Sequence, residues 1–170
     1  MCVHRAKVLI GLPVVANDRS RVVGEVKDLC VDPARRQVRA LLVVDGAVWR
    51  RTRVLPWDQI QRIGEDAVYI PAQTVLTASE ELVADCWHLM ASEGGVYGRS
   101  IIDIAGERLG RLGDILVDLS TGEIAGYELS DGMFQDLLSG RQRLLAESQL
   151  SHDGESLVIE ACRKIGRAHV

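Results

Sequence analysis

The strongest constraint on the fold of this chain is an internal repeat at an offset of 86 residues. Sliding the sequence by that distance aligns residues 22–46 with residues 108–132 without a gap, and six of these 25 positions are identical. Because self-similarity at a fixed offset is typical of a duplicated structural module, we expect two copies of about 70–75 residues each. The identical pairs are Gly24/Gly110, Asp28/Asp114, Val31/Val117, Asp32/Asp118, Asp45/Asp131 and Gly46/Gly132.

Each copy has the pattern of a β structure. The aligned segments predict two long strands, over residues 22–32 and 108–118, each ending in turn residues. The dipeptide Asp45-Gly46 predicts a hairpin in the first copy, because both central positions of a type I′ turn need positive φ. Further strands are expected at residues 12–15, 37–44, 48–55, 67–70, 100–102, 123–130, 142–146 and 156–159. Five or six short strands per copy are too few for a sandwich and favour a small closed barrel.

Residues 77–95 are expected to form one α-helix that joins the copies. Thr77 and Glu80 have the spacing of a capping box, and Gly94-Gly95 predicts the end of the helix. Five apolar side chains fall on one helical face, and such a stripe is expected to pack against barrel surface. They are Leu82, Val83, Cys86, Leu89 and Met90. We therefore predict a mainly β fold, with two tandem small β-barrels (residues 1–76 and 96–170) joined by one α-helix.

Composition favours a packed, soluble protein. Apolar residues make up 47% of the chain and aromatic residues only 4%, so the core must be built mainly from Val, Leu, Ile and Ala. The longest apolar run, residues 40–44, is far shorter than the ~20 residues that cross a bilayer, and no secretory signal is recognisable. The four cysteines form no Cys-x-x-Cys motif, so we expect reduced thiols in a cytoplasmic protein.

Charge is divided unevenly along the chain. Residues 1–78 hold 12 Lys and Arg against 8 Asp and Glu, whereas residues 79–170 hold 8 against 16, so the halves carry +4 and −8. Arg50, Arg51 and Arg53 lie beside Trp49 on an expected strand of the basic half. This surface could bind RNA, dock an acidic protein surface (including the acidic half of this chain), or serve as a charged edge that discourages strand addition. Because the net charge is −4, we favour the charged edge over protein contact, and protein contact over RNA.

The repeated polar residues are better explained by turns than by chemistry. Two aspartates four positions apart on a strand have Cα atoms ~13 Å apart, which is too far to share a metal ion or a proton. We expect the repeated aspartates to accept backbone N–H groups, and the repeated glycines to mark bulges or bends. Cys2/His4 and Cys86/His88 are 84 rather than 86 positions apart, so they are not equivalent in the repeat, and no zinc site is expected. No catalytic residue or cofactor is expected, because no nucleophile motif or phosphate-binding glycine loop is present.

The second copy contains an insertion that is unusually apolar. Leu55 and Gln59 match Leu145 and Gln149 at an offset of 90, so about four residues are added within the 133–140 connection. Apolar side chains in such a connection either plug their own barrel or form a contact surface for a partner or a second copy. The candidate interface residues are therefore Trp49, Arg50, Arg51, Arg53, Met133, Phe134, Leu137 and Leu138.

The order of these motifs resembles the PRC-barrel domain. In the first copy the resemblance rests on Gly24-x-Val26-x-Asp28, Val31-Asp32, Val54-Leu55-Pro56-Trp57-x-x-Ile60 and Gly64-Glu65-Asp66-x-Val68. The second copy resembles it through Leu109-Gly110-x-Leu112-x-Asp114 and Val117-Asp118, and its 133–141 stretch is similar to small YlmC/YmxH-like members. It departs from the first copy in having Ala146-Glu147 where the first has Pro56-Trp57.

The resemblance implies a β-barrel that binds other macromolecules and does not catalyse. Related domains include the cytoplasmic domain of the photosynthetic reaction-centre H subunit and the C-terminal domain of the ribosome maturation factor RimM. We therefore expect a non-catalytic interaction or scaffold protein that binds a protein partner or self-associates. The alternative is an RNA- or ribosome-associated accessory protein that uses the arginine-rich face of the first copy.

Overall fold

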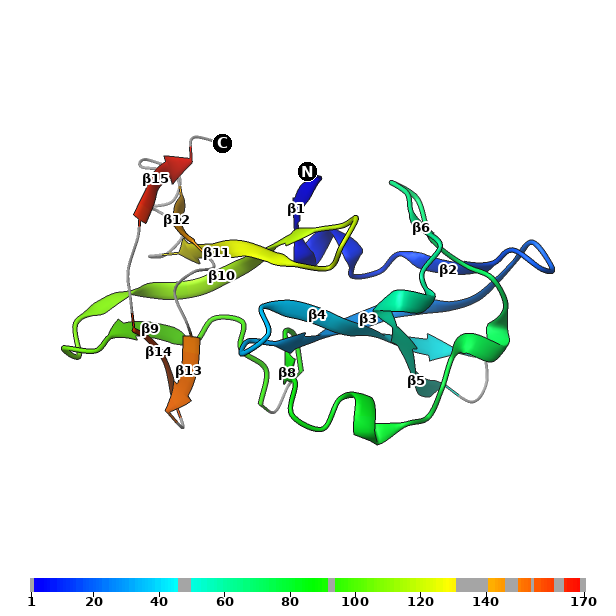
Figure 1. The fold of residues 1–170 in the computed structure, drawn as a ribbon, viewed down its shortest axis with the longest axis horizontal. Helices are drawn as coiled ribbons and strands as arrows, with labels where there is room; N and C mark the ends of the chain where they lie inside the picture. The colour runs from blue at the N-terminus through cyan, green and yellow to red at the C-terminus, as the bar shows by residue number, and fades with distance from the viewer. Residues whose placement is uncertain are drawn as a thin grey trace.

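The protein consists of two curled β-sheets that lie side by side along its longest axis (Figure 1). The computed structural model describes residues 2–45, 50–91, 94–130, 141–145, 150–153, 155–160 and 164–168. Within these ranges the helical segments are four short 3₁₀ turns. They are η1 (Ala6–Leu9), η2 (Trp57–Gln59), η3 (Gln73–Val75) and η4 (Glu80–Leu82). None of them is long and apolar enough to cross a bilayer.

The first sheet has seven strands and the second has eight. The first has the order β5-β4-β3-β2-β7-β6, with β8 paired to β3. Its strands are β2 (Pro13–Ala16), β3 (Arg21–Asp32), β4 (Gln37–Asp45), β5 (Arg51–Pro56), β6 (Arg62–Ile63), β7 (Val68–Ile70) and β8 (Trp87–His88). The second has the order β13-β14-β9-β10-β11-β12-β15, with β1 paired to β10. Its strands are β1 (Val3–Arg5), β9 (Ser100–Asp103), β10 (Arg108–Asp118), β11 (Ile124–Ser130), β12 (Arg141–Leu145), β13 (Leu150–Asp153), β14 (Ser156–Ile159) and β15 (Lys164–Ala168).

The predicted repeat is confirmed strand by strand. The long strands β3 and β10 are equivalent, and each pairs with the strand before it and the strand after it in antiparallel fashion. Each sheet also contains one parallel pair, between β2 and β7 in the first and between β9 and β14 in the second. The hairpin predicted at Asp45-Gly46 is present as the antiparallel pair β4–β5, although residues 46–49 themselves lie outside the described residues.

The repeated glycines mark bulges, as predicted. The β2–β3 pairing shifts register next to Gly24, and the β9–β10 pairing shifts next to Gly110. A Cβ atom at Gly24 would lie only 2.5 Å from Val43 Cγ1 and 2.8 Å from the Val44 carbonyl oxygen. Gly24 is therefore required because two strands approach each other closely at this bend.

The prediction of a linker α-helix over residues 77–95 is wrong. Thr77 is extended and exchanges backbone hydrogen bonds with Val54 (Thr77 N to Val54 O 2.9 Å, Val54 N to Thr77 O 2.7 Å). Further on, Trp87 and His88 form β8 and pair with β3. Because these backbone groups are bonded to the first sheet, only the 3₁₀ turn η4 forms between them, and the capping-box pattern is overridden by tertiary hydrogen bonding.

The apolar stripe of this segment is nevertheless partly buried. Leu82, Val83 and Cys86 pack against a small cluster of buried residues on β3, β4 and β5, and Leu89 is fully buried in the main core. Met90 is 39% exposed, so the prediction fails at this position. An irregular segment can therefore bury the same residues that a helix would have presented on one face.

Each copy donates its leading strand to the sheet of the other copy. The N-terminal strand β1 pairs with β10 of the second sheet, and β8, which precedes the second copy, pairs with β3 of the first. In Figure 1, β1 lies beside β10 and β8 lies beside β3, while the chain continues from each into the opposite sheet. The two copies are thus joined by a reciprocal strand exchange rather than by a linker.

A second symmetric contact joins the turns that follow the long strands. The Val38 N–H donates to the Gly122 carbonyl at 2.8 Å, and the Ile124 N–H donates to the Arg36 carbonyl at 2.9 Å. These donors and acceptors are equivalent at the repeat offset of 86, so the contact has approximate two-fold symmetry. One hydrophobic cluster contains buried residues from both copies, including Leu29, Leu41 and Ile115. The chain therefore has the internal architecture of a fused, strand-exchanged dimer.

Candidate functional site

The predicted interface residues are only partly described by the structure. Trp49 of the arginine-rich strand and Met133, Phe134, Leu137 and Leu138 of the long connection lie outside the described residues. Arg50, which precedes β5, and Arg51, the first residue of β5, are both exposed. Arg53 is half-buried, and its Nε lies 3.3 Å from Asp45 Oδ2 on the neighbouring strand. The arginines therefore do not act together: Arg53 is neutralised, whereas Arg50 and Arg51 face solvent.

The aspartates at the ends of the long strands cap turns, as predicted. Asp32 Oδ1 accepts the Arg35 N–H at 3.0 Å. Asp118 Oδ1 accepts both the backbone N–H and the hydroxyl of Ser120, at 2.9 and 2.6 Å. These carboxylates are therefore committed to local turn structure.

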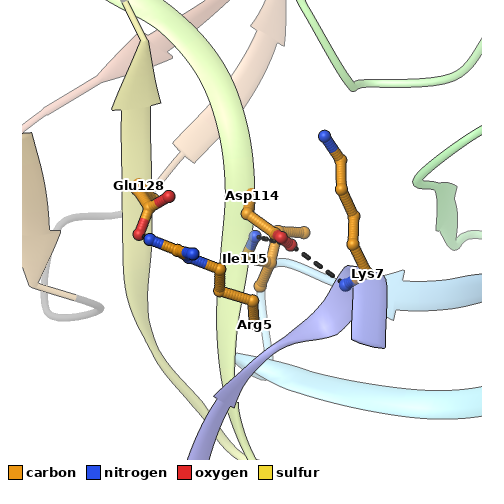
Figure 2. Close-up of polar contacts among 5 residues, drawn as sticks. All are labelled: Arg5, Lys7, Asp114, Ile115 and Glu128. Atoms are coloured by element: carbon orange, nitrogen blue, oxygen red, sulfur yellow. Dashed lines mark hydrogen bonds and ion pairs between the residues drawn. The ribbon is translucent and has the colours of Figure 1, made fainter. Parts of the chain in front are cut away.

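The mid-strand aspartates hold the exchanged strands, a role that the sequence analysis missed. Asp114 Oδ1 accepts the N–H of Ile115 at 2.8 Å and the N–H of Lys7 at 3.2 Å, as Figure 2 shows. In the first sheet, Asp28 Oδ1 accepts the N–H groups of Leu29 and Met90, both at 2.8 Å. One buried carboxylate in each sheet thus bonds to the segment that arrives from the other copy. The available signal was the identity of an acidic residue at the same strand position in both copies.

An Arg–Glu ion pair strengthens the anchor in the second sheet. Arg5 Nε lies 3.1 Å from Glu128 Oε2, and the Glu128 side chain is fully buried. Figure 2 shows the Arg5 side chain pointing toward Glu128, which lies opposite Asp114 on the neighbouring strand. A cation from the basic half of the chain therefore meets a carboxylate of the acidic half, which is one of the contacts considered for the uneven charge. The first sheet has Leu42 and His88 at the corresponding positions.

The pKa values of the two aspartates of β10 are shifted in opposite directions from the ordinary value of 3.8. Burial raises the pKa of Asp114, although hydrogen bonds from Ile115 and Lys7 oppose the shift. Hydrogen bonds from Ser120 lower the pKa of Asp118. Asp114 therefore destabilises the fold as the pH rises above 3.8, whereas Asp118 stabilises it above 3.8 and loses that effect as the pH falls. Carboxyl ¹³C NMR should show Asp118 titrating at a lower pH than Asp114, with the Asp114 signal absent in Asp114→Asn; the reverse order would contradict this assignment.

The Cys-x-His pairs belong to the equivalent strand regions of β1 and β8, but their positions differ by one residue, because Trp87 and not His88 is the counterpart of His4. Cys2 Sγ lies 3.1 Å from His4 Nε2 beside β1. In the other sheet, Cys86 Sγ approaches the Leu82 carbonyl, while His88 Nδ1 lies 3.9 Å from Asp28 Oδ2. Within the described part of the chain, no group of three or more His, Cys, Asp or Glu residues could hold a metal ion.

A cleft of about 1390 Å³ lies at the junction of the two copies. Three parts of the chain line this cleft. The exchanged N-terminal segment contributes Cys2, His4 and Val8, the first copy contributes residues 56–58 and 60–65, and the second copy contributes residues 119–121. Val8 is 49% exposed there. No single copy contains this cleft, because its walls come from both.

Trp57 joins the two copies at the base of this region. A Cβ atom at Gly122 would lie 2.7 Å from Trp57 Nε1, and Gly122 has a φ of +78°. Glycine is therefore required at this turn both for its conformation and for the indole that packs on it. Trp57 also lines the cleft, so it combines a packing role with an exposed aromatic surface.

The topology and the repeated motifs can now be compared with known proteins. The family model of the PRC-barrel domain matches residues 1–76 and 96–147. The chain belongs to the PRC-barrel family. The two matched segments are consistent with tandem PRC-barrel copies, and the two curled sheets fit that fold. No curated protein matches the chain. In this PRC-barrel protein, β1 of the first matched segment pairs in the second sheet, and β8, which precedes the second matched segment, pairs in the first.

Proposed function

We propose that this chain is a non-catalytic interaction or scaffold protein, and that a protein partner binds in the cleft between its two PRC-barrel copies. The observation that carries the proposal is a cleft of about 1390 Å³ whose walls come from both copies. This volume exceeds the roughly 300–1,000 Å³ typical of small-ligand pockets. The size and the mixed lining therefore favour a polypeptide over a small molecule.

The walls of the cleft suit an extended polypeptide segment. Consecutive residues 60–65 line one wall, which indicates that β6 faces the cleft with its edge, since a sheet face would contribute only alternate residues. β6 is the last strand of the first sheet, and β1, which precedes other lining residues of the cleft, pairs only with β10 among the described strands. Strand edges of this kind can accept an added strand through main-chain hydrogen bonds.

The roles of the acidic residues support a non-catalytic function. The aspartates that occur in both copies, which were the best candidates for acid–base chemistry, accept backbone N–H groups of turns and exchanged strands. Their positions follow from the architecture of the fold and need no substrate to explain them.

The proposal can be tested by affinity capture from the native cell with the full-length chain as bait. Val8→Arg places a bulky cation on the cleft wall, and the matched control Ile104→Arg makes the same kind of change at a side chain that is 75% exposed and does not line the cleft. The wild type and Ile104→Arg should retain the same protein, and Val8→Arg should lose it while its thermal unfolding stays unchanged. Retention that is abolished by ribonuclease, or equal retention by all three proteins, would overturn the proposal.

A further inference from the structure

A second surface, separate from the cleft, lies on the exposed face of the first sheet. Two adjoining grooves of about 360 and 490 Å³ share Glu25, Val44 and Arg50 as lining residues. Arg21 and Lys27 line the grooves from β3. None of these residues lines the cleft between the copies, so the two surfaces can be tested independently.

Within the described part of the chain, none of the three cations of this groove forms an ion pair. Lys27 and Arg50 have no acidic partner there, and Arg21 donates a 3.4 Å hydrogen bond to the neutral Gln73 Oε1. By contrast, Arg53 on the adjacent strand is paired with Asp45. The groove therefore presents free cations where an acidic ligand could pair with them.

Two of the three cations are absent from the second copy. At the repeat offset of 86, Arg21 corresponds to Glu107 and Lys27 to Gly113 in the second copy. The shared fold does not require cations at these positions, because the equivalent strand β10 forms without them.

The groove also has an apolar part and one internal carboxylate. Val22 is 61% exposed beside it, and Val44 lies within it. Glu25 lies among the cations and would repel the continuous phosphate backbone of a nucleic acid. A polypeptide can instead alternate acidic side chains with apolar ones that avoid this position.

We propose that this groove binds an acidic, partly apolar segment of a protein partner. Arg21, Lys27 and Arg50 pair with its carboxylates, and Val22 and Val44 contact its apolar side chains. Charge complementarity of this kind mainly increases the rate of association and the selectivity for acidic partners. Together with the cleft, the groove gives the chain two distinct binding surfaces, as a scaffold requires.

The test is fluorescence anisotropy with the full-length chain and a labelled peptide of glutamate and leucine. The peptide should bind in a salt-dependent way, and Arg50→Glu should weaken binding by about tenfold or more. Glu25→Gln should strengthen it, because an internal repulsion is removed. The matched control is Arg111→Glu, an exposed arginine at the position in the second copy that corresponds to Glu25, and it should leave binding unchanged.

Three results would overturn this inference. They are absence of binding, equal weakening by Arg50→Glu and Arg111→Glu, and tighter binding of a single-stranded RNA of similar length than of the peptide. Because Val8→Arg lies outside the groove, it should not change peptide affinity. Failure of the groove and failure of the cleft can thus be distinguished.

Discussion

Arg5→Ala is expected to lower the free energy of unfolding by about 1–3 kcal/mol, because it removes the guanidinium, itself 38% exposed, that faces the fully buried Glu128 carboxylate. Asp114 lies opposite Glu128, so the substitution also leaves two carboxylates close together without this cation. Equilibrium denaturation in urea measures the loss. Arg51→Ala, at an exposed arginine, is the matched control and should change stability by less than about 0.5 kcal/mol.

The double variant Arg5→Ala/Glu128→Leu separates the ion pair from simple packing. Leu42 occupies the position of Glu128 in the first sheet, so the fold accepts leucine at this point. We expect the double variant to be more stable than Arg5→Ala alone, because the buried charge is removed together with its partner. Stability of Arg5→Ala within about 1 kcal/mol of the wild type would show that the ion pair does not anchor β1.

The central strands of each sheet could be predicted because the repeat fixes them twice, whereas the short outer strands β6, β13 and β15 were missed. The segments 22–32 and 108–118 align without a gap, and they form the equivalent strands β3 and β10. Each long strand pairs with neighbours that are close in sequence, so local patterning was sufficient there.

The strand exchange could not be predicted because it depends on tertiary pairing of very short segments. β1 has three residues and β8 has two, too few to show an alternating pattern. His4 pairs opposite Val117 and Trp87 opposite Val31, so these strands are related by an offset of 83, not 86. A comparison at the main offset of 86 therefore misses the equivalence of these two strands.

The candidate site was predictable only where it is continuous in sequence. Arg50 and Arg51 are exposed, and Arg50 lines the proposed groove, but the Arg53–Asp45 pair and the contribution of Lys27 depend on strand register. The cleft is built from segments as distant as residues 2–12 and 119–121. The cleft exists because of the strand exchange, so it could not be predicted from a sequence that does not reveal the exchange.

The exchange predicts that the two copies stay together when the chain between them is cut. A protease site inserted after Ala78, an exposed residue between η3 and η4, divides the chain before β8. After cleavage, β1 remains on the sheet of the second half and β8 on the sheet of the first, and the Val38–Gly122 and Ile124–Arg36 hydrogen bonds persist. We expect one species in gel filtration, with a dissociation constant below about 1 μM, that separates only in denaturant.

The uncut insertion protein is the control for elution, and Asp28→Leu/Asp114→Leu should weaken the association, because both anchoring carboxylates are lost. Two halves that elute separately at micromolar concentration would show that the copies are independent barrels.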